Sequence, residues 1–255
     1  MKHSTVLVTG ASSGIGRSCA VKFAEAGARI ILAARRTDRT KILADDLKRS
    51  YKTDCLSVGL DVRDRNAVVR TFAGLPNEWK TIDVLVNNAG LSRGLDKIHE
   101  GKADDWDEMV DTNIKGLLYV SKEVIPGMVQ RGKGTIINIG SIAGHEVYPR
   151  GNVYAATKHA VDALTKGMRL DLVDTPVRVC TVDPGLVETE FSLVRFRGDA
   201  EKAKTAYQSL KPLSPDDVAD AVVFCATRPP HVQLAEIIIL PTAQASTTLV
   251  HRHSN

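Results

Sequence analysis

Short apolar runs alternate with helix-like segments along nearly the whole sequence, and this alternation restricts the possible folds more than any other feature. The expected strands are 5–10, 28–35, 55–62, 82–90, 134–141, 177–185 and 235–241; the expected helices are 16–27, 38–51, 64–74, 104–131, 152–173 and 214–227. Because the strands are apolar along most of their length, both faces of their sheet must be covered, which is typical of a parallel sheet. We predict one doubly wound α/β domain over residues 1–255, with about seven parallel strands and helices on both faces.

The composition is that of an ordinary globular protein and excludes several functional classes. Hydrophobic residues make up 43% of the 255 residues and charged residues 25%; the net charge is +4, without a dense Lys/Arg tract. We therefore expect no nucleic-acid partner and no membrane partner. The four cysteines are widely spaced and form no Cys/His cluster, which predicts free thiols in a reducing cytoplasm and no metal site. The first expected strand begins too early for a signal peptide, which also favours the cytoplasm.

One segment, about 188–211, does not fit the alternation. It is long and charged, and it separates the sixth expected strand from the next helix. Insertions of this kind in a compact domain often cover a binding site. We expect 188–211 to be a lid.

The turn between the first strand and the first helix reads "TGASSGIG" (9–16). Glycines at 10, 14 and 16 permit a tight turn and a close backbone approach to a phosphate, which the helix N-terminus also attracts. The turn predicts a dinucleotide site with candidate ligands Gly10, Ser12, Ser13, Gly14, Ile15 and Gly16.

The second strand ends in "AARR", where an NAD site would carry an acidic side chain for the adenosine ribose. Ala34 stands at that position and is followed by Arg35 and Arg36, which suit the extra 2′-phosphate of NADP(H). Asp61 and Asn87 also lie at carboxyl ends of strands. We expect Asp61 to accept from the adenine amino group and Asn87 to fix the loop beside the ribose.

Six motifs follow one another along the chain: "TGASSGIG", "NNAG" (87–90), Asn113 in "DTNIKG", Ser141 in "IGSIAG", "YAATK" (154–158) and "DPG" (183–185). In order and spacing they resemble the short-chain dehydrogenase/reductase family, which has a Rossmann-type fold. "LAARR", "GNVYAATK", "PGLVETEFSLVRFRGD" and "PTAQAS" resemble its NADP-dependent serine/3-hydroxy acid dehydrogenase branch, whose members also reduce malonic semialdehyde. The resemblance covers essentially the whole chain.

The resemblance implies four catalytic residues. Tyr154 would be the general base in oxidation and the acid in reduction, and Lys158, one helical turn away, would favour its phenolate and bind the nicotinamide ribose. Ser141 would hold the substrate oxygen. The backbone of Asn113 would help to hold a water that connects Lys158 to solvent.

The same resemblance implies further cofactor and substrate contacts. For a substrate carboxylate we favour Arg195 over Arg150 and Arg197, because Arg195 lies in the branch-like "VRF" run. His145 and His159 flank the site in sequence, but the tyrosine mechanism does not need them.

The family commonly assembles as a homotetramer. The remaining expected cofactor contacts are Val62, Ala89, Gly90, Pro184, Gly185, Val187 and Thr189.

The resemblance thus implies hydride transfer between NADP(H) and a small 3-hydroxy acid or its carbonyl form. Two alternatives stay open. One is a reductase of another carbonyl class, such as a ketone or a ketoacyl thioester. The other is a non-catalytic NADP-sensing protein, which the presence of Ser141, Tyr154 and Lys158 disfavours.

Overall fold

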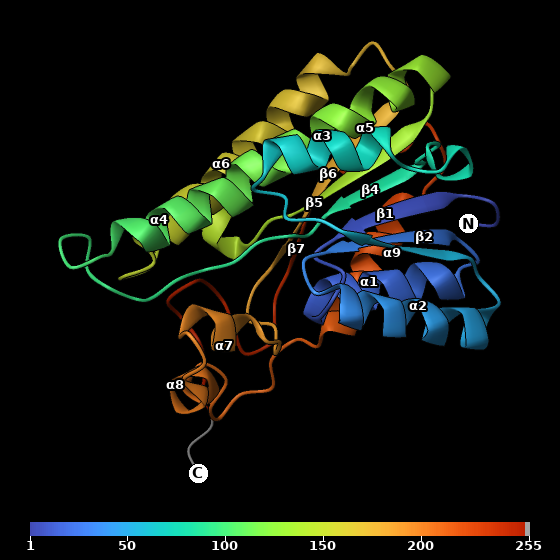
Figure 1. Ribbon diagram of the computed structural model, residues 1–255. Coiled ribbons are helices and arrows are strands. Elements are labelled where there is room, and N and C mark those ends of the chain that lie inside the picture. Colours follow the sequence, from blue (N-terminus) through green and yellow to red (C-terminus); the bar gives the residue numbers. More distant parts are fainter. Residues whose placement is uncertain (253–255) are drawn as a thin grey trace.

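The computed structural model describes residues 1–252 and contains a seven-stranded parallel sheet (Figure 1). The strand order is β3-β2-β1-β4-β5-β6-β7, and all pairs are parallel. This confirms the predicted fold class. The strands are β1 (Thr5–Thr9), β2 (Arg29–Ala34), β3 (Cys55–Gly59), β4 (Val84–Asn87), β5 (Gly134–Ile139), β6 (Val177–Pro184) and β7 (Glu236–Ile239).

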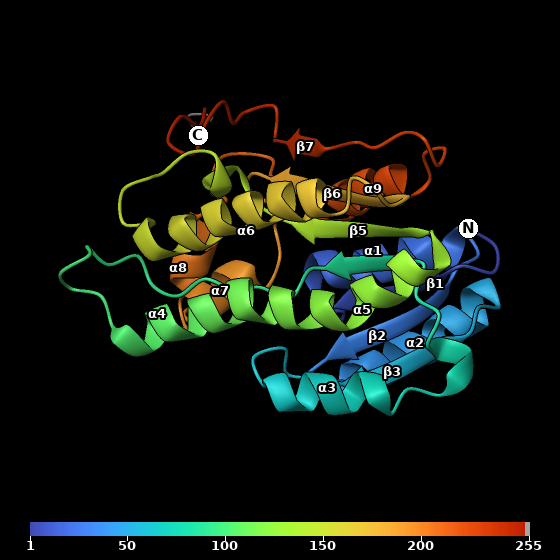
Figure 2. The same ribbon diagram turned by 90° about the horizontal axis from the view of Figure 1, so that it is seen from above.

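Helices cover both faces of the sheet (Figures 1 and 2). One layer contains α1 (Gly14–Glu25), α2 (Thr37–Tyr51) and α9 (Pro215–Ala226). The other contains α3 (Arg65–Ala73), α4 (Ala103–Val110), α5 (Leu117–Arg131) and α6 (Asn152–Asp171). None of the helices within residues 1–252 is long and apolar enough to cross a membrane.

Strand β1 shows how the sequence produces this double layer. Val6 and Val8 are fully buried in the cluster that contains Phe23 of α1, whereas Leu7 belongs to the opposite cluster with Met128 of α5. Successive side chains of a strand point to opposite faces, so a continuous apolar run needs a cover on each side.

The order in which strands are added to the sheet reverses beside β1, and this switch point positions the site. β1 pairs with β2 on one side and with β4 on the other, so the connections on its two sides lead to opposite faces. Ligands bind outside the carboxyl ends of strands at such a point. The 188–211 segment, with short helices α7 (Phe191–Arg195) and α8 (Ala200–Thr205), lies at this end of the sheet (Figure 1).

Each strand ends before its expected last residue, and the difference is largest for the runs 55–62 and 82–90. The run 82–90 is a strand only over Val84–Asn87, because the Thr9 hydroxyl accepts from the amides of Asn88 and Ala89 and replaces ladder partners there. The run 55–62 pairs only as far as Gly59, and the following residues turn toward the carboxyl edge.

The helix predicted over 104–131 contains an unpredicted π-helical section, Asp111–Gly116, between α4 and α5. The two helices still form one rod (Figure 2). At Gly116 a Cβ would lie 2.6 Å from the Val62 side chain, so a glycine is needed where the widened turn meets the sheet edge. π-helical turns are rare and are frequent at functional sites.

Candidate active site

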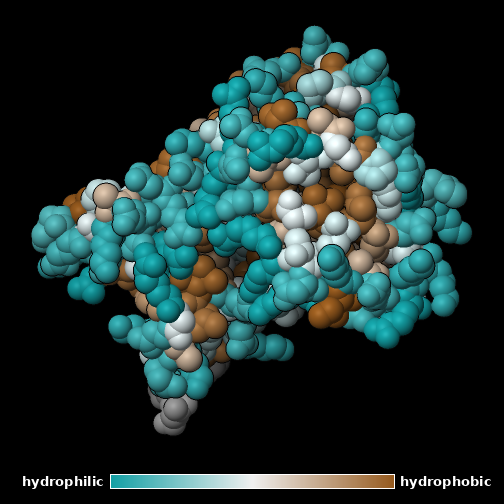
Figure 3. Space-filling model, viewed as in Figure 1, coloured by the Kyte–Doolittle hydropathy of each residue, from teal (hydrophilic) through white to brown (hydrophobic). Residues whose placement is uncertain are grey.

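A cleft of about 460 Å³ opens at the carboxyl ends of the strands. The glycine turn, the ends of β2 to β6 and the 188–211 segment line it. In the space-filling view, apolar atoms interrupt the mainly hydrophilic surface in the recess beside the 188–211 segment (Figure 3). The volume suits one ligand of cofactor or drug size.

The glycine turn forms one end of the cleft. Gly10 and Gly14 have φ angles of +66° and +51°, which L-residues rarely adopt. Ser12, Ser13 and Ile15, which are expected cofactor contacts, line the cleft with them. Gly16 does not line the cleft; a Cβ there would lie 2.5 Å from the Gly10 carbonyl oxygen, so Gly16 closes the turn from behind.

Arg36 reaches back from the end of β2 to the glycine turn. Its Nε donates to Ser12 Oγ at 3.1 Å and its Nη2 to Ser13 Oγ at 2.7 Å. Its Nη1 donates to Glu190 Oε2 at 2.8 Å, and Arg39 binds the other carboxylate oxygen of Glu190. Arg35 also lines the cleft. Sequence reasoning found both arginines of "AARR" and missed Glu190, which lies 154 residues away from Arg36.

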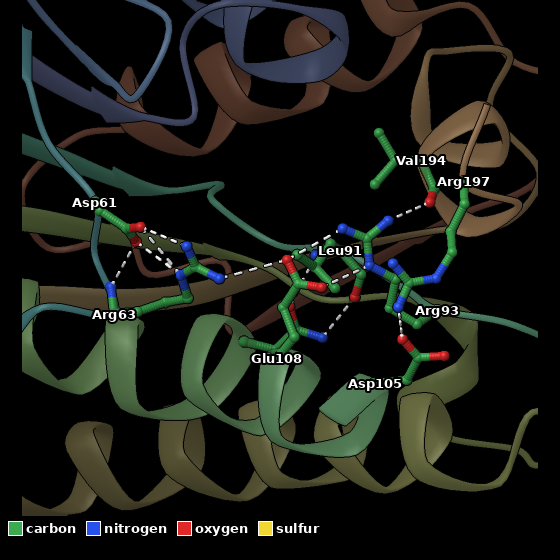
Figure 4. Close-up of polar contacts among 9 residues, drawn as sticks. Asp61, Arg63, Leu91, Arg93, Asp105, Glu108, Val194 and Arg197 are labelled. Atoms are coloured by element: carbon green, nitrogen blue, oxygen red, sulfur yellow. Dashed lines mark hydrogen bonds and ion pairs between the residues drawn. The ribbon is translucent and has the colours of Figure 1, made fainter. Parts of the chain in front are cut away.

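Asp61 and Val62, two further expected cofactor contacts, line the cleft beyond β3. Arg63 donates to both carboxylate oxygens of Asp61 and thereby lowers the Asp61 pKa, although partial burial opposes this. Figure 4 shows that these contacts continue from Arg63 through Glu108 to Arg93. Asp61 is therefore ionised and already partnered, with capacity left to accept from a ligand.

The expectation for Asn87 needs correction. Its Nδ2 donates to Ser121 Oγ at 3.0 Å and to Asn138 Oδ1 at 2.9 Å, so the side chain lies inside the sheet layer and not in the cleft. Asn88 lines the cleft instead, and its Nδ2 donates to the carbonyl oxygens of Thr9 and Gly10. Successive residues point to opposite faces, so choosing the first asparagine of "NNAG" selected the wrong face. Ala89 and Gly90 do line the cleft.

Tyr154, Lys158 and Ser141 come together in the middle of the cleft. Tyr154 and Lys158 lie on one face of α6 and are only 9% and 7% exposed. Lys158 Nζ lies 5.9 Å from the Tyr154 ring centroid and donates to the Ile139 carbonyl oxygen at 2.9 Å. Ser141 follows β5, and its Oγ accepts from the Ala143 amide at 3.1 Å.

Burial shifts the pKa values of both α6 side chains. Burial raises the Tyr154 pKa, while the Arg195 charge and a hydrogen bond with Ser141 oppose the rise. Burial lowers the pKa of Lys158 to about 8, and the Asp183 charge opposes that shift. At pH 7 the site therefore holds a neutral phenol beside a lysine that is still mostly protonated.

Asn113 lies behind the cleft wall. Its Oδ1 accepts from the Leu91 amide and its Nδ2 donates to the Leu91 carbonyl oxygen, each at 2.8 Å. Nδ2 also donates to Thr157 Oγ1 of α6 at 3.0 Å. The amide oxygen and the amide nitrogen of Asn113 both form hydrogen bonds, and these join the β4–α4 loop to α6, the helix that carries Tyr154.

The expected contacts after β6 line the opposite wall. Pro184, Gly185, Val187 and Thr189 are all cleft residues. At Gly185 the space for a side chain is filled by Gln244, whose Oε1 accepts from the Leu186 amide at 2.8 Å.

Of the three candidate carboxylate ligands, only Arg195 lies in this cleft. Its guanidinium carbon is 5.3 Å from the Tyr154 ring centroid. It donates to Ser92 Oγ at 3.0 Å and Tyr148 OH at 3.1 Å, and within residues 1–252 it has no acidic partner. Arg197 instead pairs with the buried Asp105 of α4, and Arg150 lines a separate small hollow.

Two histidines lie near the site without facing Tyr154. His159 Nδ1 is 2.9 Å from the Ala155 carbonyl oxygen of its own helix. His145 Nε2 is 3.3 Å from Asp183 Oδ2, and its Nδ1 is 3.6 Å from Glu236 Oε1. The His145, Asp183 and Glu236 cluster has the residue types of a metal site, but the two carboxylates face different ring nitrogens of His145. All four cysteines are free.

Gly140 fixes the spacing between Ser141 and the end of β6. A Cβ at Gly140 would overlap the buried Asp183 carboxylate. We expect Gly140→Ala to lower the free energy of unfolding by about 1–3 kcal/mol through overpacking. Chemical denaturation measures this. The control is Gly167→Ala on α6, where nothing lies within 4 Å and alanine should add about 1 kcal/mol. Equal effects of the two changes would contradict this explanation.

Known proteins resemble the chain over nearly its whole length. The short chain dehydrogenase family matches residues 4–198. NADP-dependent 3-hydroxy acid dehydrogenase YdfG of Salmonella typhi is 47% identical over 249 residues, 97% of this chain and 99% of that protein. An NADP-dependent 3-hydroxy acid dehydrogenase of Schizosaccharomyces pombe is 43% identical, covering 97% and 96%. The closed form of serine dehydrogenase complexed with NADP+ has a TM-score of 0.91 at 45% identity, covering 98% and 100%.

Proposed function

The chain belongs to the short chain dehydrogenase family, and from this premise we propose that it is an NADP(H)-dependent oxidoreductase of small 3-hydroxy acids. It transfers a hydride between NADP(H) and a 3-hydroxy acid or its carbonyl form. The substrate class includes L-serine, L-allo-threonine, 3-hydroxyisobutyrate and the pair 3-hydroxypropionate and malonic semialdehyde. The relatives named above support both the cofactor and the substrate class.

The residues at one end of the cleft fit NADP(H). The glycine turn leaves its backbone open to a pyrophosphate, and no acidic residue stands at the end of β2. Ser12, Ser13 and Arg36 form a polar group that suits a 2′-phosphate, with Arg35 beside them. When bound, the nicotinamide supplies the hydride acceptor or donor.

The catalytic residues then manage the substrate oxygen and its proton. In oxidation Tyr154 accepts the hydroxyl proton, and in reduction it returns a proton to the carbonyl oxygen. Lys158 stabilises the phenolate, and Ser141 holds the substrate oxygen. The raised pKa keeps Tyr154 protonated, as carbonyl reduction requires. Oxidation requires the phenolate, which the Lys158 and Arg195 cations near the ring stabilise. Asn113 positions α6 through Leu91 and Thr157.

The position of Arg195 is the observation that favours a substrate with a carboxylate. Arg195 is a cation at the Tyr154 ring, inside the cleft, and its hydrogen-bond partners Ser92 and Tyr148 are both neutral. A short hydroxy acid that puts its oxygen on Tyr154 can reach this guanidinium with its carboxylate. The 188–211 segment that carries Arg195 serves as the lid over the substrate.

A substrate panel tests the proposal. NADP+ reduction is measured with L-serine, L-allo-threonine, 3-hydroxyisobutyrate and 3-hydroxypropionate, and NADPH oxidation with a ketoacyl thioester. We expect turnover with the hydroxy acids. Turnover of the thioester alone would favour the other carbonyl class, and no turnover despite NADP+ binding would favour a sensing protein.

We expect Arg195→Ala to raise KM for the hydroxy acids by about 10–100-fold, since one charged hydrogen-bonding partner is lost. Neutral ketones should lose little. Steady-state kinetics with both classes measure this. An equal loss for both would show that Arg195 is not a carboxylate ligand.

We also propose a cytoplasmic homotetramer. The free cysteines suit a reducing compartment. Exposed apolar side chains on α5 and just after α6, among them Val129 and Val173, suit burial against partner subunits.

A further inference from the structure

The guanidinium of Arg36, which the proposed function assigns to the 2′-phosphate, already holds a carboxylate. Glu190 Oε2 accepts from Arg36 Nη1 at 2.8 Å, and Glu190 Oε1 accepts from Arg39 Nη1 at 2.7 Å. Burial raises the Glu190 pKa, but hydrogen bonds from Arg39 and Arg36 outweigh it and hold the pKa below its ordinary value. An anion from the protein itself thus lies beside the proposed phosphate site.

The rest of this group is suited to a phosphate. Ser12 and Ser13 accept from Arg36 through their oxygens, so both hydroxyl protons remain free to donate to an anion. The same two contacts already fix the orientation of Arg36, so Glu190 is not needed for that purpose. A phosphate bound by these serines and by the remaining N–H groups of Arg36 would lie directly beside the Glu190 carboxylate, and the like charges would repel.

The Glu190 contact is also open to exchange. The side chains of Arg36, Arg39 and Glu190 are 41%, 45% and 38% exposed, and exposed ion pairs are weak. Arg39 could keep one carboxylate oxygen while Arg36 turns to another anion. Only one of the two ion pairs must then break.

Glu190 connects this site to the catalytic tyrosine. It is the residue directly before α7, whose first residue, Phe191, lies with its ring centroid 5.6 Å from that of Tyr154. The far end of α7 is tied to the opposite wall, where Arg93 Nη1 donates to the Val194 carbonyl oxygen at 2.5 Å (Figure 4). Arg197 pairs with Asp105 there. The helix therefore spans the cleft from the proposed phosphate site to the proposed substrate site.

We propose that Glu190 is a specificity-determining residue of the cofactor site: its carboxylate competes with the 2′-phosphate of NADP(H) for Arg36 and is displaced when the phosphate binds. The inference rests on the proposed use of NADP(H). Glu190 lowers the affinity for phosphorylated adenosine ligands and leaves ligands without a 2′-phosphate unaffected.

The test is calorimetric titration of the full chain with two probes, adenosine 2′,5′-bisphosphate and 5′-AMP, which differ by the 2′-phosphate. For Glu190→Gln we expect the Kd of the bisphosphate to fall at least about fivefold, the lower range of couplings between sites, while the Kd of 5′-AMP changes less than about twofold. Glu188→Gln is the matched control, because it removes the same charge two residues away. Glu188 is exposed and has no ion pair within residues 1–252.

Each other outcome is informative. An unchanged bisphosphate Kd in Glu190→Gln, or an equal decrease in Glu188→Gln, would overturn competition at Arg36. Weaker bisphosphate binding in Glu190→Gln would also overturn it and would make Glu190 a residue that orients Arg36. If the unaltered protein binds both probes equally, the assignment of NADP(H) fails together with the inference.

Discussion

Tyr154→Phe is expected to reduce kcat by about 10²–10⁴-fold, the range that positioned proton transfer contributes. The phenol is buried and lies between Ser141 and the Lys158 and Arg195 cations, where we expect it to exchange a proton with the substrate oxygen. The change removes one hydroxyl and keeps the ring that packs on Phe191. Steady-state kinetics in both directions measure the effect.

Cofactor affinity provides the control for this variant. The NADPH Kd should change less than about threefold, because the adenosine end of the cleft depends on Arg36 and the two serines of the glycine turn. Retained turnover in Tyr154→Phe would remove the tyrosine from the chemistry. A lost fold would be visible as lost NADPH binding.

Lys158→Met is expected to lower kcat by about 10²–10³-fold, as for the loss of one preorganised electrostatic group. Methionine keeps much of the buried stem and removes the charge. The variant should also change the pH dependence of carbonyl reduction. Lysine is cationic below its pKa, so with a pKa of about 8 the unaltered protein loses this charge, and with it activity, as the pH rises through about 8.

The pH profile distinguishes electrostatics from packing. In Lys158→Met the decline near pH 8 should be absent, because there is no proton to lose. Lys158→Arg restores a permanent charge and should also lack this decline. A decline near pH 8 that persists in both variants would assign it to another group.

The fold was predictable because its signal is repeated and local. Each strand and each covering helix has its own apolar pattern, and their regular alternation leaves few topologies. The glycine turn and Arg36 could be placed because each occupies a strand end, and Tyr154 and Lys158 could be placed on one helical face by their spacing. The roles of Ser141, Tyr154 and Lys158 came from the family resemblance.

Contacts between distant segments were not predictable. The ion pair of Arg36 with Glu190 depends on how the 188–211 segment folds back, and that segment has no periodic pattern. The choice between Asn87 and Asn88 depended on the last paired residue of β4, where an error of one residue reverses the face. The π-helical turn at Asn113 changes the helical period too little for the sequence to reveal it.

The central claim is hydride transfer between NADP(H) and a 3-hydroxy acid in this cleft. The most direct measurement supplies L-allo-threonine deuterated at C3, the carbon that bears the hydroxyl, and analyses the reduced cofactor by mass spectrometry. We expect NADP+ to become NADPH carrying one deuterium, and NAD+ to react far more slowly because it lacks the 2′-phosphate for Arg36. Unlabelled NADPH, or equal use of NAD+, would contradict the central claim.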